Sequence, residues 1–547
     1  MTKCPAVALG ILLSAGCAAQ TIGLTQYDPA YADGYMLFSP NGNTRTYLVD
    51  RCGREVNAWT ATNTPGLVAQ LQPDGTLLRS ANTNNPDFAA GGRGGRLERF
   101  DWSGNLLWGY DLSNDSLCQH HDFTVLPNGN IVVIAWDRHD STAAVAMGKD
   151  PAETNAYLWS DQLLELQPVG TDSAVVVWRW KLWDHMVQDL NGLLPNYGTV
   201  SDHPELVDIN FFQGPPNSFD WIHLNSVAYD PLFDRLLVSS HNLDEVWVID
   251  HSTTTSEATM HVGGNSGKGG DLLYRWGNPL AYGRGSVADQ RLFGQHHATW
   301  LPPGHPHAGK ILVFNNGNGR PGVDYSSLEI IAPPMDGLGN YTITPGSAYL
   351  PLAPDWIYTA PVPSDFYCTN ISGVFPVADG YLVTDGPAGH FFQLDAAGSV
   401  AWQYTNPVNA QGPMTQGAVP NGNSVFRCEF YPSSFAGFSG LNLTPGTEIE
   451  LAPLLPSLCA TAGLEEVRMD DAVVYPNPVV DRVRISGLAQ GASTATVHNA
   501  LGAVVLRDGT NLGTDRVLDL SGLSSGAYVL HLSSATTVVA KHLVVAR

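Results

Sequence analysis

One hairpin-like sequence occurs three times in this chain of 547 residues. Residues 97–108 read LERFDWSGNLLW and residues 391–402 read FFQLDAAGSVAW, and the two strings align without a gap. Residues 47–59, YLVDRCGREVNAW, form a looser copy. Each copy predicts a strand, a turn that contains glycine and a second strand that ends in tryptophan. A chain that repeats such a hairpin is constrained to a repetitive β-architecture.

Strings of a second type alternate with these hairpins, and in each of them a turn separates a short strand from an apolar strand. They read LQPDGTLLRS, VLPNGNIVVIAW, YDPLFDRLLVSS, WLPPGHPHAGKILVF, PVADGYLVTD and AVPNGNSVFR. The two types together give about six units between Gly34 and about Leu451. Small antiparallel sheets of this kind close radially into a β-propeller. We therefore predict an all-β protein built around a six-bladed β-propeller, with a β-sandwich or a β-helix as alternatives.

Two long insertions interrupt the repeat. Residues 195–220 and 262–271 are rich in Gly, Asn and Pro. In a propeller they would form loops on a face, and such loops carry a large share of binding and catalytic residues.

Composition and charge limit the partners. The chain is 44% hydrophobic and 14% charged, which suits one large domain and a smaller one. Its formal net charge of −24 argues against a nucleic-acid partner and against attraction to anionic lipid surfaces. An anionic substrate must therefore be attracted by local cations, against the overall field.

The N-terminus, MTKCPAVALGILLSAGCAAQ, combines one lysine, an apolar run and a stretch of small residues. This pattern is typical of a secretory signal peptide, so we predict that residues 1–19 are removed and that residues 20–452 form the propeller domain. A lipoprotein acylated at Cys17 is the alternative. No other segment has the run of about 18 to 20 apolar residues that spans a bilayer, and we predict no membrane span.

Five cysteines remain after the predicted cleavage, and an odd number allows at most two disulfides. They are Cys52, Cys118, Cys368, Cys428 and Cys459. No CxxC pair occurs, so a cysteine-based zinc site is not predicted. Cys118 precedes the first of two Gln-His-His strings, but Gly294 takes its place in the second, so we interpret Cys118 as structural rather than as a nucleophile.

The composition changes after Ala452. Residues 453–472 are predicted to be a linker, and residues 473–547 a small C-terminal β-sandwich with strands near 479–485, 495–497, 503–507, 516–520, 527–533 and 537–546. This tail resembles the type A C-terminal sorting domain of the type IX secretion system, through VYPNP at 474–478, NALG at 499–502, residues 518–528 and KHLVV at 541–545. The resemblance implies export through the periplasm and across the outer membrane by the type IX machinery, to the medium or the cell surface.

Histidines are the candidate functional residues. His121 lies five residues before Leu126, and His296 lies five before Leu301, so the two occupy equivalent places in two blades. His223 begins a similar strand in DWIHLNSVAYD. Three blades thus offer one histidine each, which predicts a ring of imidazoles around the channel mouth. Since neighbours on a strand point to opposite faces, one ring of each His-His pair faces the channel, and the pattern does not say which.

Two chemistries suit such a ring. Several imidazoles can bind a transition metal, with an aspartate or water completing the coordination shell. Alternatively, one neutral imidazole attacks an electrophile while the others donate hydrogen bonds to its oxygens.

Six strings containing or flanking these histidines point to a family. QHHDFTVLPNGN, DWIHLNSVAYDP, LLVSSHNLDEVWVID, DLLYRWGNP, GQHHATWLP and ILVFNNGNGRP resemble the arylsulfate sulfotransferases that work without the nucleotide sulfate donor PAPS. The resemblance runs in order through residues 35–451. It implies a six-bladed propeller without a cofactor or metal, and a ping-pong reaction in which a histidine takes a sulfuryl group from an aryl sulfate donor and passes it to a phenolic acceptor.

The resemblance also implies residue roles. The nucleophile matches His296, which follows Gln295, and His297 is the near alternative. His121 and His223 match the other two active-site histidines, and Asn225 matches a neighbouring polar position.

One position departs from the family pattern. This chain has His241 where an arginine is expected after the Ser-Ser pair. Either His241 replaces the cation in a pH-dependent way, or Arg275 reaches the substrate, or Arg275 braces a loop.

Two other functions compete with sulfuryl transfer. One is a metal-dependent propeller hydrolase or oxidoreductase that uses the same histidines. The other is a non-catalytic surface propeller that binds glycans or aryl anions and has lost activity with the arginine.

Overall fold

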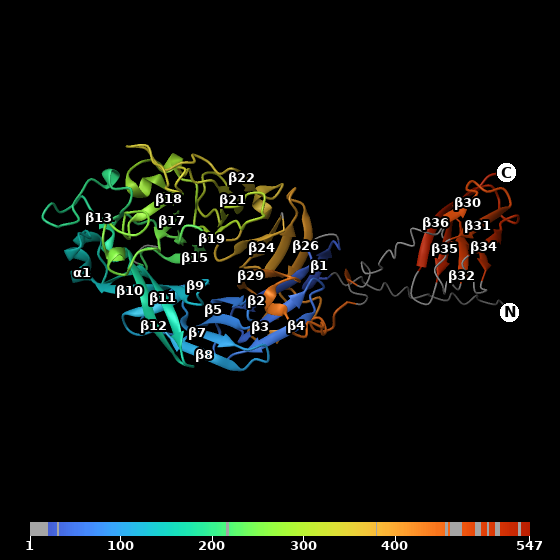
Figure 1. Ribbon diagram of the computed structural model, residues 1–547, viewed down its shortest axis with the longest axis horizontal. Helices are drawn as coiled ribbons and strands as arrows, with labels where there is room; N and C mark the ends of the chain where they lie inside the picture. Colours follow the sequence, from blue (N-terminus) through green and yellow to red (C-terminus); the bar gives the residue numbers. More distant parts are fainter. Residues whose placement is uncertain are drawn as a thin grey trace, which may run out of the picture. The chain divides into compact units, whose positions relative to one another are not determined.

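The computed structural model divides the chain into two compact units, Met1–Leu458 and Cys459–Arg547, each of which is considered separately (Figure 1). The residues that it describes are 20–29, 32–214, 218–378, 380–454, 458–459, 473–486, 494–499, 503–508, 515–533 and 538–547. The predicted signal peptide lies outside the described residues, as does most of the predicted linker.

The first unit is all-β apart from short helical turns. Its described residues form six antiparallel sheets of four or five strands, together with two small two-stranded sheets. In each sheet the strands are given in the order in which they are hydrogen-bonded. Sheets 1 to 3 are sheet 1, β29(Val425–Pro432), β2(Gly34–Pro40), β3(Arg45–Asp50), β4(Glu55–Thr60); sheet 2, β5(Pro65–Leu71), β6(Leu77–Asn82), β7(Gly95–Phe100), β8(Leu106–Asp111); and sheet 3, β9(Leu117–Val125), β10(Ile131–Asp140), β11(Tyr157–Val169), β12(Ser173–Lys181). Sheets 4 to 6 are sheet 4, β15(Leu224–Asp230), β16(Arg235–Ser240), β17(Glu245–Asp250), β18(Leu272–Trp276); sheet 5, β19(His296–Trp300), β20(Ile311–Asn315), β21(Ser327–Ile331), β22(Trp356–Tyr358); and sheet 6, β23(Gly373–Val377), β24(Gly380–Asp385), β25(His390–Leu394), β26(Val400–Thr405), β1(Gly23–Tyr27).

The connections carry the remaining elements. They are α1(Ser141–Ala146), the 3₁₀ turns η1(Pro151–Glu153), η2(Leu182–Asp184), η3(Val200–Asp202), η4(Glu257–Thr259), η5(Pro279–Tyr282), η6(Val287–Asp289), η7(Pro363–Asp365) and η8(Ala436–Phe438), and the short strands β13(Met186–Val187), β14(Val207–Asp208), β27(Val408–Asn409) and β28(Gly412–Pro413). Helix α1 begins at Asp140, whose carboxylate accepts a hydrogen bond from the Ala143 N–H at 2.8 Å, as expected for an N-cap.

Consecutive sheets lie against one another through their first strands. Strand β2 contacts β5, β5 contacts β9, β9 contacts β15, β15 contacts β19 and β19 contacts β23. Strand β23 then contacts β29, which belongs to sheet 1, so the series returns to its start. Figure 1 shows these strands near the middle of the first unit. Their ends are therefore the part of the fold where residues from every sheet can meet.

The tryptophan that ends each predicted hairpin joins one sheet to the next. The indole N–H groups that do this lie on the fourth strand of sheets 1 to 4, in the order given above, and on β26 of sheet 6. They donate as follows: Trp59 to Asp101 O at 2.8 Å, Trp108 to Ser173 O at 2.8 Å, Trp178 to Thr253 Oγ at 3.1 Å, Trp276 to Pro351 O at 2.7 Å and Trp402 to Arg51 O at 2.8 Å. The bond of Trp402 connects sheet 6 to sheet 1. The tryptophan that is repeated in the sequence therefore corresponds to a contact that recurs between neighbouring sheets.

Replacing Trp402 with phenylalanine should lower the free energy of unfolding by about 1–3 kcal/mol, because a buried carbonyl loses its donor. The matched control is Trp159→Phe, since Trp159 is also buried but its indole N–H has no hydrogen-bond partner. Urea unfolding of both variants tests the difference. Equal losses in the two variants would show that the indole size, and not its hydrogen bond, stabilises the junction.

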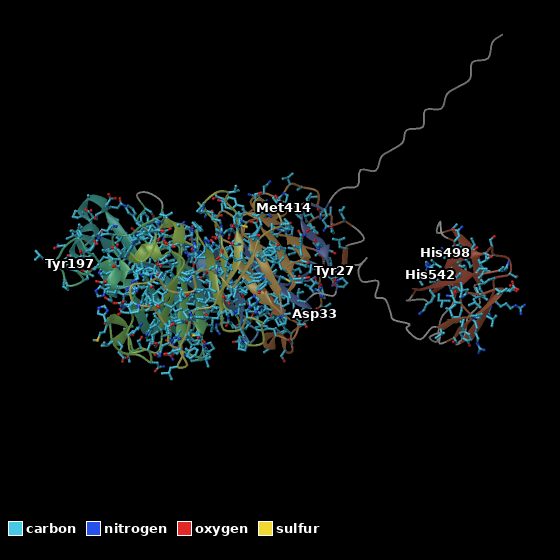
Figure 2. The ribbon with its side chains drawn as sticks, turned by 90° about the horizontal axis from the view of Figure 1, so that it is seen from above. Tyr27, Asp33, Tyr197, Met414, His498 and His542 are labelled. Atoms are coloured by element: carbon cyan, nitrogen blue, oxygen red, sulfur yellow. The ribbon has the colours of Figure 1, made fainter. Side chains whose placement is uncertain are left out.

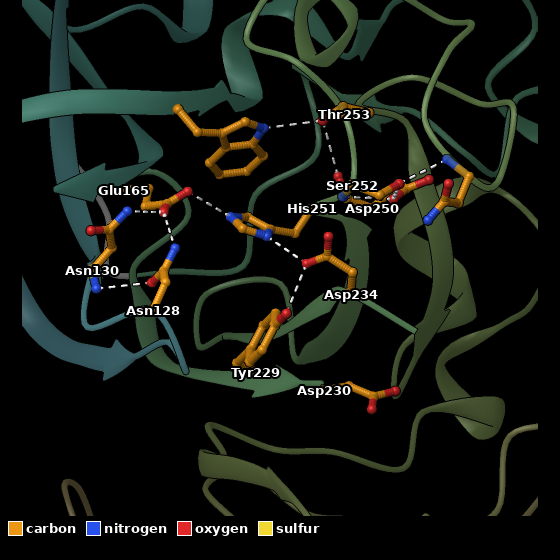
Figure 3. Close-up of polar contacts among 12 residues, drawn as sticks. Asn128, Asn130, Glu165, Tyr229, Asp230, Asp234, Asp250, His251, Ser252 and Thr253 are labelled. Atoms are coloured by element: carbon orange, nitrogen blue, oxygen red, sulfur yellow. Dashed lines mark hydrogen bonds and ion pairs between the residues drawn. The ribbon is translucent and has the colours of Figure 1, made fainter. Parts of the chain in front are cut away.

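A partly buried polar cluster joins sheets 3 and 4 (Figure 3). His251 lies between two carboxylates, with its Nδ1 2.7 Å from Asp234 Oδ1 and its Nε2 3.2 Å from Glu165 Oε2. Both partners are acceptors, so both ring nitrogens carry protons. Burial lowers the pKa of His251, but hydrogen bonds and charge from the two carboxylates outweigh it, and the pKa is raised. His251 is therefore an imidazolium within this cluster.

This cluster should make stability depend on pH. Because the folded pKa of His251 is raised, its stabilisation is complete below about pH 6.5 and disappears as the pH rises through the folded value. The variant His251→Gln keeps polarity but cannot titrate. The difference in unfolding free energy between wild type and His251→Gln should therefore shrink as the pH rises, as measured by urea titrations. A pH-independent difference would contradict the charged state assigned to His251.

The second unit contains two antiparallel sheets in its described residues. One has the order β30(Val473–Tyr475), β31(Arg482–Ser486), β34(Asp515–Asp519), and the other β33(Val504–Asp508), β32(Thr494–His498), β35(Gly526–Ser533), β36(Val538–Val545). Apolar side chains from both sheets, among them Val483, Leu518, Val497, Leu530 and Leu543, share one core. Figure 2 labels His498 and His542 on this unit. All six strands predicted for the tail are present, with ends that differ by a few residues.

Candidate active site

Four of the predicted histidines lie in one row, here called the histidine row. His121 is on β9, His223 directly precedes β15, His241 directly follows β16, and His296 begins β19. The ring centroids are 4.5 Å apart from His121 to His223, 5.2 Å from His223 to His241 and 5.2 Å from His241 to His296. The structure thus brings together the four residues that sequence analysis singled out as catalytic.

The backbone explains how His121 enters the row. Its φ of 50° is in the left-handed region, and its N–H donates to Gly92 O at 2.7 Å. The ring lies against Gly92 so closely that a Cβ there would be 1.8 Å from His121 Cε1. Only glycine fits at position 92 while His121 keeps this orientation.

The two His-His pairs contribute different members to the row. In the first pair the second residue, His121, joins it, whereas in the second pair the first residue, His296, does so. His120 instead stacks on Trp136 at 4.0 Å, and His297 contacts the Phe375 ring at 4.4 Å. His297 also accepts the Val374 N–H at 3.1 Å, so its ring is directed to sheet 6 and lies outside the row.

Each ring of the row is anchored through Nδ1. The partners are His120 Nδ1 at 2.8 Å for His121, Asp220 Oδ2 at 2.5 Å for His223, Asn242 Oδ1 at 2.9 Å for His241, and Asn316 Oδ1 at 2.8 Å with Gly294 O at 3.2 Å for His296. Within the described part of the chain, the Nε2 atoms of these four rings take part in no hydrogen bond.

The amide of Asn316 fixes the tautomer of His296. Its nitrogen donates to two carbonyls, Cys368 O at 2.8 Å and Ile371 O at 3.1 Å, so its oxygen faces His296. An amide oxygen only accepts hydrogen bonds, and therefore His296 Nδ1 carries the proton. The lone pair of the neutral ring is then on Nε2. An imidazole nitrogen needs such a lone pair to act as a nucleophile.

Charge is unevenly distributed along the row. Burial, and then the neighbouring rings His241 and His223, hold the pKa of His296 well below its usual range, and His121 is affected similarly. Burial, and then His223, lower the pKa of His241 to about 4. Burial opposes ionisation of His223 too, but the charge and hydrogen bond of Asp220 raise its pKa above the usual value. These shifts favour the charged ring at His223 and the neutral ring at the other three positions of the row.

A chain of hydrogen bonds behind the row sets the tautomer of His121. Burial, and then the charge of Asp220, raise the pKa of the Asp161 carboxyl well above its usual range. The protonated Asp161 Oδ1 can donate to His120 Nε2 at 2.6 Å, while its Oδ2 accepts the Leu224 N–H at 3.2 Å. His120 Nδ1 then donates to His121 Nδ1, which leaves an N–H on His121 Nε2. Sequence analysis missed Asp161, because no pattern connects it to the histidines.

A fixed cation near the row comes from sheet 1. Arg427, on β29, is buried, donates to Asp122 Oδ2 at 2.7 Å and to Asn225 O at 2.8 Å, and has no partner for its Nε. Its charge contributes to the low pKa of His121 and of His296. Arg427 was not predicted from the sequence either, although it is the last residue of the repeat string AVPNGNSVFR.

Arg275 lies outside the row and braces the fold. It forms a buried ion pair with Glu245, with Nε 2.9 Å from Oε1, and donates to Leu206 O at 2.8 Å. Asn225 and Gln295 are likewise engaged with the protein: the Asn225 amide donates to Gln295 O at 2.7 Å. Gln295 donates to Ser240 O at 2.8 Å, so both residues connect sheets 4 and 5 behind the histidines.

The thiol beside the first pair is not activated. Cys118 is buried, and burial raises its pKa to about 11, which keeps it protonated at neutral pH. Cys368 and Cys428 are also free and buried, whereas Cys52 and Cys459 are disulfide-bonded. These observations agree with a structural role for Cys118.

The first unit is thus all-β and carries a buried row of four imidazoles from three of its sheets. The family model for arylsulfotransferase (ASST) matches residues 24–327, more than half of the chain. The protein belongs to the arylsulfotransferase (ASST) family. The matched segment includes all four histidines of the row but ends before Arg427.

A second family model, for the secretion system C-terminal sorting domain, matches residues 473–546. This domain directs the protein to export, to the cell surface or the medium. None of the helices in the described residues has the length and apolar character needed to cross a membrane.

Other comparisons are distant. No curated protein sequence gives a significant match. Similar solved structures include a protein of unknown function from Bacteroides caccae, with a TM-score of 0.39 and 11% identity over 73% of this chain and 99% of that chain. Virginiamycin B lyase from Staphylococcus aureus has a TM-score of 0.30 and 11% identity, over 72% of this chain and 87% of that chain. AztD from Citrobacter koseri has a TM-score of 0.32 and 9% identity, over 73% and 99%.

Proposed function

We propose that this protein is an exported arylsulfate sulfotransferase that moves a sulfuryl group from a phenolic sulfate ester to a phenolic acceptor through a covalent sulfohistidine, without a nucleotide donor. The observation that carries the proposal is the state of His296. Its Nδ1–H is fixed by Asn316 and its pKa is low, so its Nε2 presents a lone pair at neutral pH. Membership of the arylsulfotransferase family supports the same chemistry.

The proposal extends to architecture. The six sheets of the first unit would be the blades of a six-bladed propeller spanning residues 20–452, and the two sheets of the second unit a β-sandwich spanning residues 473–547. Residues 1–19 would be the signal peptide and residues 453–472 the linker. Contact between β23 and β29 and the Trp402 bond to Arg51 support closure of the ring.

In the first half-reaction, His296 Nε2 attacks the sulfur of the donor, an N–S bond forms and the ester S–O bond breaks. The departing phenolate takes the proton from His223 Nε2, because His223 is the imidazolium of the row. His121 donates its Nε2–H to a sulfuryl oxygen on which charge is spread in the loose transition state. Arg427 and His223 are the cations beside the row, and each is paired with one carboxylate, Asp122 and Asp220 respectively, so they offset local negative charge rather than add a net positive charge.

In the second half-reaction the acceptor phenol attacks the sulfur and the N–S bond breaks. His223, now neutral, takes the phenol proton, so the enzyme returns to its starting state. His241 has its proton on Nδ1 and a pKa of about 4, so its Nε2 can only accept a hydrogen bond. A ring in this state carries no positive charge, so we propose that His241 does not replace the expected arginine.

The direct test is release of nitrophenolate from 4-nitrophenyl sulfate in the presence of phenol, together with detection of phenyl sulfate. Release that depends on phenol, and phenyl sulfate formed in equal amount, are expected. Folded protein that binds aryl sulfates without turning them over would instead support the non-catalytic propeller.

The pH profile of kcat/KM should be asymmetric. His223 must be protonated and its pKa is raised, so activity should persist above about pH 6.5 and fall as the pH rises through the folded value. On the acidic side, His241 remains neutral down to about pH 4, so no loss from this ring is expected at mildly acidic pH. A profile that rises steadily with pH through this range would contradict the role of His223 as the acid.

A further inference from the structure

A second cluster of ligand-type side chains lies away from the histidine row. The nitrogens of His185 and His261 and a carboxylate oxygen of Asp271 lie within 4.8 Å of one another. Asp271 Oδ1 is 2.8 Å from His185 Nδ1 and 2.8 Å from His261 Nδ1. Two imidazoles are thus directed at one oxygen.

Two different segments bring these residues together. His185 follows strand β12 and turn η2, and is fully buried beside Trp180, with their rings nearly parallel. His261 and Asp271 flank the glycine-rich insertion 262–270. Gly270 permits the approach, since a Cβ there would be 2.4 Å from His185 Nε2. The insertion that the sequence marks as a functional loop therefore begins and ends at this cluster.

The two polar contacts of the His185 ring require a proton or a metal ion beside its Nδ1. Its Nε2 is 2.8 Å from Ala258 O, and a backbone carbonyl only accepts, so Nε2 carries a proton. In the neutral ring Nδ1 then has a lone pair, which faces Asp271 Oδ1, a second acceptor, at 2.8 Å. Two lone pairs cannot face each other unless a proton or a metal ion lies between them.

Two features favour the metal ion. A His261 nitrogen reaches the same carboxylate oxygen, so three ligand atoms from two segments of the chain converge on one point. In addition, a metal-binding histidine usually donates its other ring N–H to a backbone carbonyl, as His185 does to Ala258.

We propose that His185 Nδ1, His261 Nδ1 and Asp271 Oδ1 bind a divalent cation of the zinc type. Two imidazoles and a carboxylate are a ligand set that zinc accepts, with water in the fourth position. Bond lengths of about 2.0–2.2 Å require neighbouring ligand atoms somewhat more than 3 Å apart, a small expansion of the 2.8 Å contacts. His261, whose side chain is 60% exposed, can supply the expansion at its own contact, whereas the His185–Asp271 contact requires a small shift of the Asp271 carboxylate.

Space for the fourth ligand is present. His261 and Asp271 line a cavity of about 610 Å³, which also contains Glu205 and Tyr197. Figure 2 shows Tyr197 at one end of the first unit and Tyr27 and Asp33 at the other. The cation would join both ends of the 262–270 insertion to the segment after β12, and so would brace this loop without taking part in sulfuryl transfer.

The test is Zn²⁺ binding by the full chain after removal of metal with a chelator, measured by competition with a colorimetric zinc indicator. Wild type should take up zinc in a one-to-one ratio at this site. His261→Ala, which changes an exposed side chain, should weaken binding by at least about tenfold, and Asp271→Asn should do the same. Co²⁺ should give the visible bands of a tetrahedral site in wild type but not in His261→Ala.

The matched control is His307→Ala, which removes a partly exposed histidine elsewhere and should leave binding unchanged. Nitrophenolate release by His261→Ala should equal that of wild type, so the outcome is independent of the proposed transferase activity. Zinc binding that is equally strong in wild type, His261→Ala and Asp271→Asn would overturn the proposal, as would no binding by wild type. In that case His185 is a buried imidazolium paired with Asp271.

Discussion

Replacing His296 with asparagine is expected to abolish nitrophenolate release, lowering kcat by about 10⁴-fold or more, because the attacking nitrogen is lost. Asparagine can still donate to Asn316, so the fold around the row is preserved. The same substitution at the adjacent position, His297→Asn, is the matched control. Its amide oxygen can accept the Val374 N–H as His297 Nδ1 does, and turnover should stay within a few-fold of wild type.

A second measurement locates the covalent group. Wild type quenched during turnover of donor without acceptor should carry a sulfuryl group on the peptide that contains His296, and His296→Asn should carry none. If His297→Asn were inactive and His296→Asn active, the nucleophile would be the other ring of the pair. If both variants turned over normally, the sulfohistidine mechanism itself would be wrong.

The second large effect is expected at Asp220. Its Oδ2 accepts from His223 at 2.5 Å, and its Oδ1 accepts from the Trp136 indole at 3.0 Å. An asparagine offers one acceptor where two donors need one each, and it removes the negative charge that raises the pKa of His223. Asp220→Asn should therefore lower kcat/KM by about 10²–10⁴-fold and move the alkaline limb of the pH profile to lower pH.

Asp161 provides the matched control for this substitution. Since Asp161 is assigned as a neutral acid, Asp161→Asn keeps both of its contacts: the amide N–H donates to His120 Nε2, and the oxygen accepts the Leu224 N–H. Turnover should remain within a few-fold of wild type. If Asp161→Asn were as damaging as Asp220→Asn, Asp161 would be ionised and the proton positions along His120 and His121 would be reversed.

Local pattern was enough to predict much of the fold. The Gly-containing hairpins that carry Trp59, Trp108 and Trp402 are present, because a hairpin is specified by its own turn and alternation, but their second strands continue past the tryptophan to Thr60, Asp111 and Thr405 instead of ending there. The spacing of His121 and His296 from the following Leu-Pro also predicted that they would meet. Both predictions depend only on residues close together in sequence.

The remainder of the site depends on contacts between sheets that no local pattern specifies. Strand pairing is irregular at each His-His pair, opposite Val133–Ala135 of β10 in one and between His296 and Thr299 in the other, so simple alternation does not tell which ring of a pair faces the row. Arg427 reaches the histidines from sheet 1, and Asp161 reaches His120 from β11, two strands away from β9 in the same sheet. The sequence alone did not tell whether Arg275 reaches the substrate or braces a loop. In the structure its charge is paired with Glu245.

Strand β29, which pairs with β2 although the two come from opposite ends of the first unit, has a consequence for how the protein matures. It carries both Phe426, whose ring contacts His121 and His296, and Arg427. Pairing of segments so distant in sequence is slow to form and cannot begin until the whole unit has been made. The site is therefore assembled last, and sulfuryl transfer should appear only in chains whose folding has reached its final step, which makes turnover a sensitive reporter of that step during export.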